Sequence, residues 1–357
     1  MKLSLNWLLI FVPIAAILEH IHAGPAVIFF ASCLSIVPLA GIMGHATEIL
    51  ADRAGAAVGG LLNATFGNAA ELIIAYVAMS KGLHDVVKAS LVGSIIGNIL
   101  LVLGVSTLAG GLRYKILRFN ITAASSGASM LLLSAVGLLV PAMYAHMAKN
   151  PESIRELSTE ISVVLLASYL FSLVFSLKTH KYLYDGGAAA EAAEETDLAE
   201  GENSQGSIKG AMLTLMVSTV VVAWMSEILV GVVEAASESM GLTNVFVGII
   251  VVAVVGNAAE HSSAVMMALK DKMDVAFGIA VGSSIQIALF VAPVLVLCSL
   301  SMDKPMDLVF TPPEVMAVII SVLVVGQISQ DGESHWLEGV QLLSVYTILA
   351  FVFFHIR

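Results

Sequence analysis

Long apolar stretches separated by short polar segments occupy nearly the whole chain of 357 residues. A helix needs about 20 apolar residues to cross the hydrocarbon core of a bilayer. Because the stretches are continuous and do not alternate with polar residues, they favour spanning helices over the strands of a barrel. The pattern predicts eleven membrane-spanning helices, at 3–22, 26–51, 59–80, 85–109, 121–146, 158–178, 208–233, 244–269, 273–300, 314–329 and 337–355.

The composition supports an integral membrane protein. Hydrophobic residues make up 58% of the chain and charged residues only 12%, against about 25% charged in soluble domains. The apolar run after Lys2 weakly resembles a signal peptide, but its polar ending is poor and we interpret it as a first spanning helix. The two cysteines, Cys33 and Cys298, are expected to be isolated buried thiols.

An acidic segment at 180–207 divides the chain. Residues 191–202 hold six acids and no base, which accounts for much of the net charge of −11. A solvated linker and an acidic helix that attracts cations or regulates transport both remain open. No basic patch suggests a nucleic-acid partner.

Lysine and arginine predict the orientation. In the eleven-helix order, ten of the 16 basic residues fall on the side of the N-terminus and six on the other side. This bias predicts a cytoplasmic N-terminus, a cytoplasmic acidic segment and an external C-terminus, with the plasma (inner) membrane as the expected location.

An internal repeat is the strongest structural signal. The sequence Gly67-Asn68-Ala69-Ala70-Glu71 recurs at Gly256–Glu260, 189 residues later, and Gly93-Ser94 recurs as Gly282-Ser283 at the same offset. An odd number of helices per copy inverts the second copy. The sequence therefore predicts an all-α membrane fold with one extra helix at 1–24, a first five-helix repeat at 25–179, an acidic linker at 180–207 and a second five-helix repeat at 208–357.

The duplicated glutamates are the principal candidate site. A carboxylate inside a membrane helix costs about 2.5–3.5 kcal/mol on insertion scales and marks a functional site by default. Asn68 precedes Glu71 by three residues, and Asn257 precedes Glu260 by three, so each pair shares a helix face. Glycine before each asparagine lets a helix break and frees backbone carbonyls.

Oxygen ligands of this kind suit a hard cation such as Ca²⁺. Two carboxylates neutralise one divalent ion, and two protons can replace it with the same net charge. The pattern thus predicts exchange of Ca²⁺ for H⁺, with Glu71, Glu260, Asn68, Asn257, Gly67 and Gly256 as metal ligands.

These motifs closely resemble those of the CAX family of calcium/proton exchangers, part of the cation/calcium exchanger superfamily. The resemblance covers nearly the whole chain, including the acidic segment and His261 after the second motif. It implies Ca²⁺ coordination by Glu71 and Glu260 with carbonyls at the Gly-Asn steps. It also implies a site lined by Ser94, Ser283, Gln286, Asn98 and His261, and alternating access as the transport mechanism.

One departure from the sodium-coupled relatives favours protons. Those relatives carry an acid five positions after the glycine of the second Gly-Ser motif. Here that position is Ile287, and its counterpart in the first repeat is Asn98. A sodium ligand is therefore missing, although a sodium/calcium exchanger remains the alternative within the same fold.

Two further acids, Glu48 and Glu227, fall late in equivalent helices of the two repeats. We expect them to relay protons or guide the ion at opposite entrances, with solvated interfacial acids as the alternative. His45, one turn before Glu48, either pairs with it or is a separately satisfied or solvated histidine.

A membrane enzyme and a channel are the rival classes. The chain lacks the His-Glu-x-x-His motif of zinc proteases, and its buried acids are glutamates rather than paired aspartates. The sequence predicts no catalytic residue and no cofactor, and its partners are Ca²⁺, H⁺ and the lipid bilayer. A homo-oligomer is compatible with it. Rings of carboxylates also occur in channels, but broken helices in inverted repeats favour alternating access.

Overall fold

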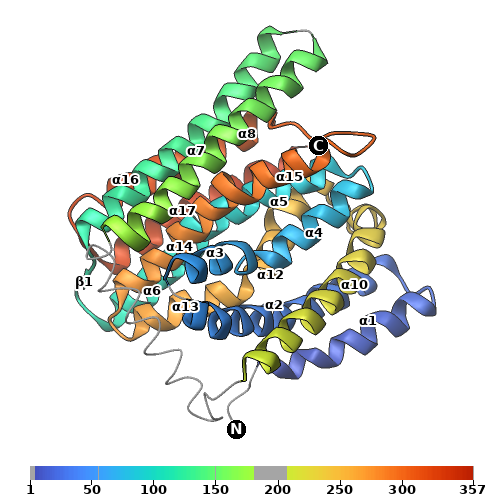
Figure 1. The fold of residues 1–357 in the computed structure, drawn as a ribbon, viewed down its shortest axis with the longest axis horizontal. Coiled ribbons are helices and arrows are strands. Elements are labelled where there is room, and N and C mark those ends of the chain that lie inside the picture. The colour runs from blue at the N-terminus through green and yellow to red at the C-terminus, as the bar shows by residue number, and fades with distance from the viewer. Residues whose placement is uncertain (1–4, 55, 149, 181–206, 357) are drawn as a thin grey trace. The chain divides into compact units, whose positions relative to one another are not determined.

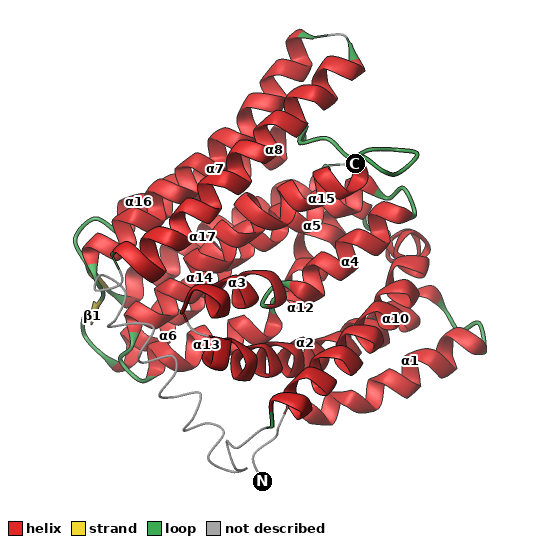
Figure 2. Cartoon of the chain, viewed as in Figure 1, coloured by secondary structure: helices red, strands yellow, loops and turns green. Residues whose placement is uncertain are grey.

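The computed structural model describes residues 5–54, 56–148, 150–180 and 207–356. The chain forms two compact units, and each takes helices from both predicted repeats. Unit 1 comprises residues 1–94, 207–259 and 352–357, and unit 2 comprises residues 95–206 and 260–351. Nearly all the described residues are helical, as the sequence predicts (Figure 2).

Unit 1 contains the N-terminal helices of each predicted repeat. Its elements are η1 (Leu5–Ile10), α1 (Phe11–His20), α2 (Pro25–Ala54), α3 (Ala56–Phe66), α4 (Ala69–Ser80), most of α5 (His84–Ile96), α10 (Ile208–Met240), α11 (Asn244–Phe246), the π-helical segment η5 (Val247–Val252) and α12 (Ala253–Gly256).

The long helices α2 and α10 lie side by side in unit 1 and form its most extensive helix pair (Figure 1). Helix α10 also packs against α4. Lys81, at the end of α4, donates a hydrogen bond from Nζ to the backbone oxygen of Glu227 over 3.1 Å. Helix α10 ends at Met240, and the φ of 68° at the following Gly241 suits glycine.

Unit 2 contains the remaining helices of both repeats. Its elements are the π-helical segment η2 (Gly97–Val102), α6 (Leu103–Arg113), β1 (Leu117–Arg118), α7 (Ile121–Met147), α8 (Pro151–Val174), the π-helical segment η3 (Phe175–Thr179), nearly all of α13 (Ala258–Leu269), α14 (Met273–Gln286), the π-helical segment η6 (Ile287–Val291), α15 (Ala292–Ser299), α16 (Pro312–Ile328), β2 (Glu333–Ser334) and most of α17 (Trp336–His355).

Polar N-cap residues, which directly precede the helices, explain several helix starts in unit 2. The Asn120 side chain accepts hydrogen bonds from the backbone at the start of α7, and Asn150 does the same for α8, which opens with Pro151. Thr311 and Glu314 form a capping box at α16. These side chains satisfy backbone groups that a helix end leaves unpaired.

A short antiparallel pairing, β1 with β2, joins two loops of unit 2. Arg118 and Glu333 form an ion pair across it over 3.2 Å, and the Phe119 ring stacks on Phe277 of α14. The Asn120 backbone N–H donates to Asp274, also of α14. The two loops joined by this β1–β2 clasp lie on the same side of the membrane in the predicted eleven-helix order.

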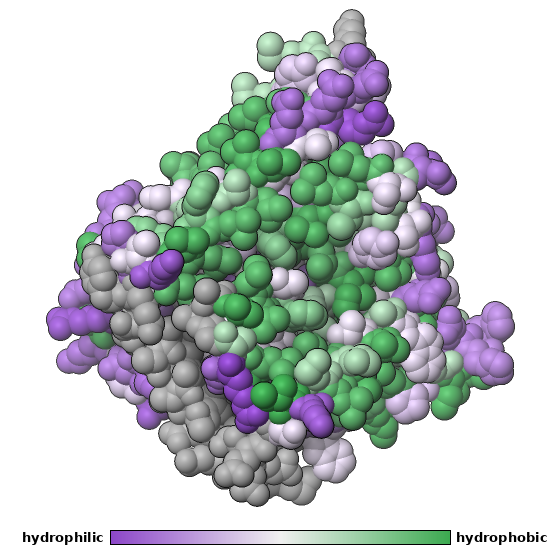
Figure 3. All heavy atoms as spheres, in the orientation of Figure 1, coloured by the Kyte–Doolittle hydropathy of each residue, from purple (hydrophilic) through white to green (hydrophobic). Residues whose placement is uncertain are grey.

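Large apolar side chains cover the visible surface of α7, whereas hydrophilic side chains gather at the tip of the α7–α8 hairpin (Figure 3). Phe171 on α8 is 75% exposed and Met143 on α7 is 55% exposed. Such a surface suits contact with lipid. The expectation of two buried thiols is wrong for Cys298, which is exposed, whereas Cys33 is buried.

Seven described helices are long and apolar enough to cross a membrane, and the bent pair at 244–269 makes eight. Shorter apolar helices cover 6–20, 69–80 and 312–328. Every predicted stretch thus coincides with helix, but the count of eleven spanning helices stays a prediction. Several predicted helices were too short, because the observed helices continue through polar residues such as Glu152 and Glu238. The acidic segment at 181–206 lies outside the described residues.

Candidate functional site

The helix breaks fall at the two copies of the motif. Helix α3 ends at Phe66 and α4 begins at Ala69, so Gly67 and Asn68 form the first break. In the second copy α12 ends at Gly256 and α13 begins at Ala258. Helices α4 and α13 have bounds 189 residues apart at both ends.

Each break places its acid in the first turn of the following helix, Glu71 in α4 and Glu260 in α13. The positive end of a helix dipole favours a negative charge there. The helix that stops at the break leaves carbonyl oxygens at its end, as in transporters built from discontinuous helices.

Unit 1 brings the acid of the first motif to the glycine of the second. A Cβ atom built on Gly256 would lie 3.1 Å from Oε1 of Glu71. The carboxylate therefore occupies the space that a side chain at position 256 would fill. This proximity brings one residue from each copy of the motif together.

Asn257 meets the Gly-Ser motif of the first repeat. Its Nδ2 donates to Oγ of Ser94 over 3.0 Å and to the backbone oxygen of Ala253 over 2.9 Å. Asn257 and Ser94 are only 1% and 2% exposed. Asn68 is fully buried as well. Four predicted site residues of unit 1, Glu71, Gly256, Asn257 and Ser94, thus form two contacts between the repeats.

Gly93 allows this approach. A Cβ atom at Gly93 would overlap the backbone of Ile249 in the π-helical segment η5. One turn along the same contact, a Cβ atom at Gly248 would lie 2.7 Å from Cβ of Ala89. The two backbones touch because the residues at the crossing are small.

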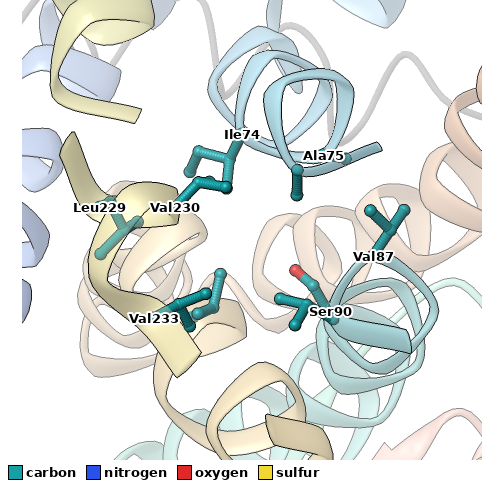
Figure 4. Close-up of a pocket in the computed structure, with 10 residues that line it drawn as sticks. Ile74, Ala75, Val87, Ser90, Leu229, Val230 and Val233 are labelled. Carbon is teal, nitrogen blue, oxygen red and sulfur yellow. The ribbon is translucent and has the colours of Figure 1, made fainter. Parts of the chain in front are cut away.

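A small cavity lies beyond these contacts in unit 1 (Figure 4). Helix α4 contributes Ile74 and Ala75, α5 contributes Val87 and Ser90, and α10 contributes Val230 among others. Apolar side chains dominate the lining, so the cavity lacks the converging oxygen atoms that a cation needs.

In unit 2 the Glu260 carboxylate forms a hydrogen bond with the side chain of Ser283. Ser283 is 7% exposed. The Oε2 atom of Glu260 is buried and has no hydrogen-bond partner among the described residues. A buried carboxylate oxygen without a donor suits a site whose partner is a cation or a proton.

Asn98 and Ile287 hold equivalent positions of the two repeats, each in a π-helical segment of unit 2. Asn98 belongs to η2 and Ile287 opens η6, and both are buried. Nearby, the hydroxyl of Ser284 donates to the backbone oxygen of Ile95 over 3.2 Å. Segments of π-helix occur frequently at functional sites. The buried apolar side chain at 287 provides no cation ligand.

The remaining predicted residues are less enclosed. Glu48 pairs with His45 over 3.6 Å, with side chains 33% and 60% exposed. The Glu227 side chain is exposed, and its backbone oxygen is the partner of Lys81. His261 and Gln286 are half-buried.

Among the described residues, no three His, Cys, Asp or Glu side chains cluster as a metal site. The two motifs themselves contain carboxylate, amide and backbone carbonyl oxygens, the ligand types that Ca²⁺ takes.

Sequence reasoning missed the contact at Ile249 and the anchoring of Lys81. The close helix contact at Ile249 could have been predicted, since Ala89 and Gly93 form a small-xxx-small pattern on one helix face. The hydrogen bond of Lys81 had no signal in the sequence. An exposed lysine at a helix end does not indicate that its partner is a backbone oxygen of a distant helix.

Apolar helices that break at Gly-Asn steps, each break followed by a glutamate, define a multi-pass membrane transporter of the discontinuous-helix type. The sodium/calcium exchanger protein family model matches residues 24–178 and 210–355. The chain belongs to this family.

Two relatives and one solved structure illustrate the similarity. A Ca²⁺/H⁺ antiporter of Synechocystis is 48% identical over 357 residues, covering 97% of this chain and 96% of the relative. The Ca²⁺/H⁺ antiporter ChaA of Bacillus subtilis is 45% identical over 344 residues, covering 96% of both chains. The solved structure of native YfkE is 41% identical, with a TM-score of 0.84 and coverage of 98% of this chain and 99% of that one.

Proposed function

We propose that this chain is a secondary transporter that exchanges Ca²⁺ for H⁺ across a membrane by alternating access. The observation that carries the proposal is the position of the Glu71 carboxylate against Gly256, where the second helix span breaks. Relatives 45–48% identical over nearly the whole chain are named Ca²⁺/H⁺ antiporters. The chain is a transporter in this proposal and not an enzyme.

Glu71 and Glu260 bind Ca²⁺ or protons in competition in the proposed mechanism. Asn68, Asn257 and backbone oxygens at Gly67 and Gly256 complete the ligand set. The charges balance, because the site is neutral with one Ca²⁺ on two carboxylates or with one proton on each. Buried Oε2 of Glu260, which lacks a hydrogen-bond partner among the described residues, supports this assignment.

Ser94, Ser283, Gln286, Asn98 and His261 line the ion path in the same proposal. Buried Ile287 supports proton over sodium coupling, because no carboxylate stands there to bind Na⁺. Glu48 and Glu227 relay protons or guide the ion at opposite entrances. Glu48 on α2 is partly exposed and Glu227 on α10 is exposed, which supports accessible positions.

The competition gives the exchange a pH dependence of defined sign. Protons must leave the carboxylates before Ca²⁺ is bound by both, so apparent Ca²⁺ affinity rises with pH through the titration of the pair. Because the two groups are coupled, the pair titrates in macroscopic steps. An apparent affinity that is constant or falls between acidic and alkaline buffers would contradict the competition.

The decisive experiment uses purified protein in sealed liposomes, with Ca²⁺ uptake and lumenal pH recorded together. An outwardly directed H⁺ gradient should drive Ca²⁺ inward, and a Na⁺ gradient should not. Uptake that requires Na⁺ would indicate a sodium/calcium exchanger. Uptake without proton counterflow at clamped membrane potential would indicate a channel.

The proposed location is the plasma (inner) membrane, with the N-terminus in the cytoplasm. The excess of basic residues on the N-terminal side supports this orientation, and so does the β1–β2 clasp, which joins loops assigned to one side. Labelling single cysteines introduced at Arg118 and at Lys304, in a background that lacks Cys33 and the exposed Cys298, with an impermeant reagent in intact cells tests it. Only the cysteine at 304 should react.

A further inference from the structure

The amide of Asn257 has a defined orientation in unit 1. The backbone oxygen of Ala253 lies 2.9 Å from Nδ2. A carbonyl oxygen can only accept a hydrogen bond, so the amide group that faces it must be the NH₂. The same nitrogen donates to Oγ of Ser94 over 3.0 Å. Both amide protons are thereby used, and Oδ1 points away from these two partners.

Ser94 is well placed to hold that orientation. It is 2% exposed and follows Gly93, whose backbone touches that of Ile249. The helix contact at Gly93 therefore fixes where the hydroxyl stands relative to Asn257. In a buried setting, an amide that loses one acceptor rotates or leaves a donor unsatisfied, and both cost free energy.

We propose that Ser94 is a positioning residue for cation binding, which holds the Asn257 amide so that its oxygen faces the transported ion. The inference rests on the proposed function, because it assigns a role to Ser94 within that site. Ser94 acts through Asn257 in this proposal and not as a ligand itself.

A merely structural hydrogen bond between helices is the competing explanation. Loss of a structural bond lowers the stability of the folded protein and leaves the affinity for Ca²⁺ unchanged. Loss of a positioning bond raises the KM for Ca²⁺, because the oxygen ligand loses its preferred direction.

The test compares three substitutions at Ser94 in liposomes, with KM and maximal rate for Ca²⁺ uptake and the thermal midpoint in detergent. Ser94→Ala should raise KM about 3- to 10-fold, the change expected from one buried hydrogen bond, with a nearly normal maximal rate. Ser94→Thr keeps the hydroxyl and should restore KM. Ser94→Cys keeps the volume with a weak acceptor and should resemble Ala, which covers the case in which the alanine variant does not fold.

Ser90→Ala is the matched control. Ser90 lies one turn earlier on the same helix and lines the apolar cavity of Figure 4, so this substitution removes a hydroxyl without touching Asn257. Its KM should equal that of the unchanged protein. An equal rise in Ser90→Ala would overturn the proposal.

A double-mutant cycle separates the proposal from the proposed function. In an Asn257→Ala background, Ser94→Ala should add little to the rise in KM, because its effect passes through the amide. Additive effects, or an unchanged KM in Ser94→Ala and Ser94→Cys alone, would overturn the role of Ser94 while leaving exchange intact. Absence of Ca²⁺/H⁺ exchange by the unchanged protein would instead overturn both the proposed function and this inference.

Discussion

The two helix breaks share five identical residues but differ in their surroundings. Before the first break, α3 is a regular α-helix, whereas the second break follows a π-helical segment and only four residues of α12. A Cβ atom at Gly67 would lie 2.5 Å from the backbone oxygen of Asn63, and one at Gly256 would meet the Glu71 side chain. Gly67 therefore avoids a clash with the backbone at the first break, whereas Gly256 makes room for the Glu71 carboxylate at the second.

The two Gly-Ser motifs differ in a similar way. A Cβ atom at Gly93 would overlap the Ile249 backbone, whereas one at Gly282 would meet no atom within 4 Å among the described residues. Identical residues at equivalent positions of the two repeats therefore need not pack in the same way. The two copies provide natural matched pairs for mutagenesis.

The largest effect on transport is expected at the glutamates, which we take to be equivalent in the two copies of the motif. Glu71→Gln and Glu260→Gln should each reduce Ca²⁺/H⁺ exchange below detection, because one remaining carboxylate cannot neutralise a divalent ion. Expression and the thermal midpoint should remain close to normal, since glutamine keeps the shape of the side chain. Substantial flux in either variant, measured in liposomes, would show that the copies are not equivalent in function.

The Gly-Ser pair should show a large difference in stability. Gly93→Ala should lower the free energy of unfolding by about 1–3 kcal/mol, as overpacking does, because a rigid backbone stands in the way. Gly282→Ala should raise it by about 0.5–1 kcal/mol, because alanine is the better helix residue. Thermal midpoints of the two variants in one detergent test this, and equal shifts would refute the contact at Ile249.

The glycines at the breaks should separate affinity from stability. Gly256→Ala should raise the KM for Ca²⁺ by displacing the Glu71 carboxylate, with a small change in thermal midpoint because that side chain can move. Gly67→Ala should mainly lower the midpoint, because the Asn63 oxygen is part of the backbone. Uptake kinetics and melting curves of both variants test this. A lower midpoint in Gly256→Ala together with a higher KM in Gly67→Ala would contradict the prediction.

The smallest effect is expected at the surface clasp of unit 2. The Arg118 side chain is 78% exposed and the Glu333 side chain 41% exposed, and exposed ion pairs contribute about 0.2–1 kcal/mol. Arg118→Ala should therefore shift the thermal midpoint only slightly, and less at high salt. Lys304→Ala is the control, since Lys304 belongs to a loop outside the clasp. A large loss of stability in Arg118→Ala would mean that the β1–β2 pairing depends on this charge.

The sequence by itself determined the class of protein and the main elements. Continuous apolar stretches predict spanning helices because no other arrangement satisfies their backbone within lipid, and all of them coincide with helices in the structure. The repeated Gly-Asn-Ala-Ala-Glu motif also marked where the helices break, since glycine and a following polar residue are local properties.

Only the tertiary structure decided which residues of the two copies meet. Contacts of Glu71 with Gly256 and of Ser94 with Asn257 join residues more than 160 positions apart, as the bond of Asn257 to Ser94 shows with a separation of 163. Local patterns carry no information about such distances. The different packing of Gly93 and Gly282 has the same cause. A glycine permits another backbone to approach closely, but the tertiary structure determines whether one does.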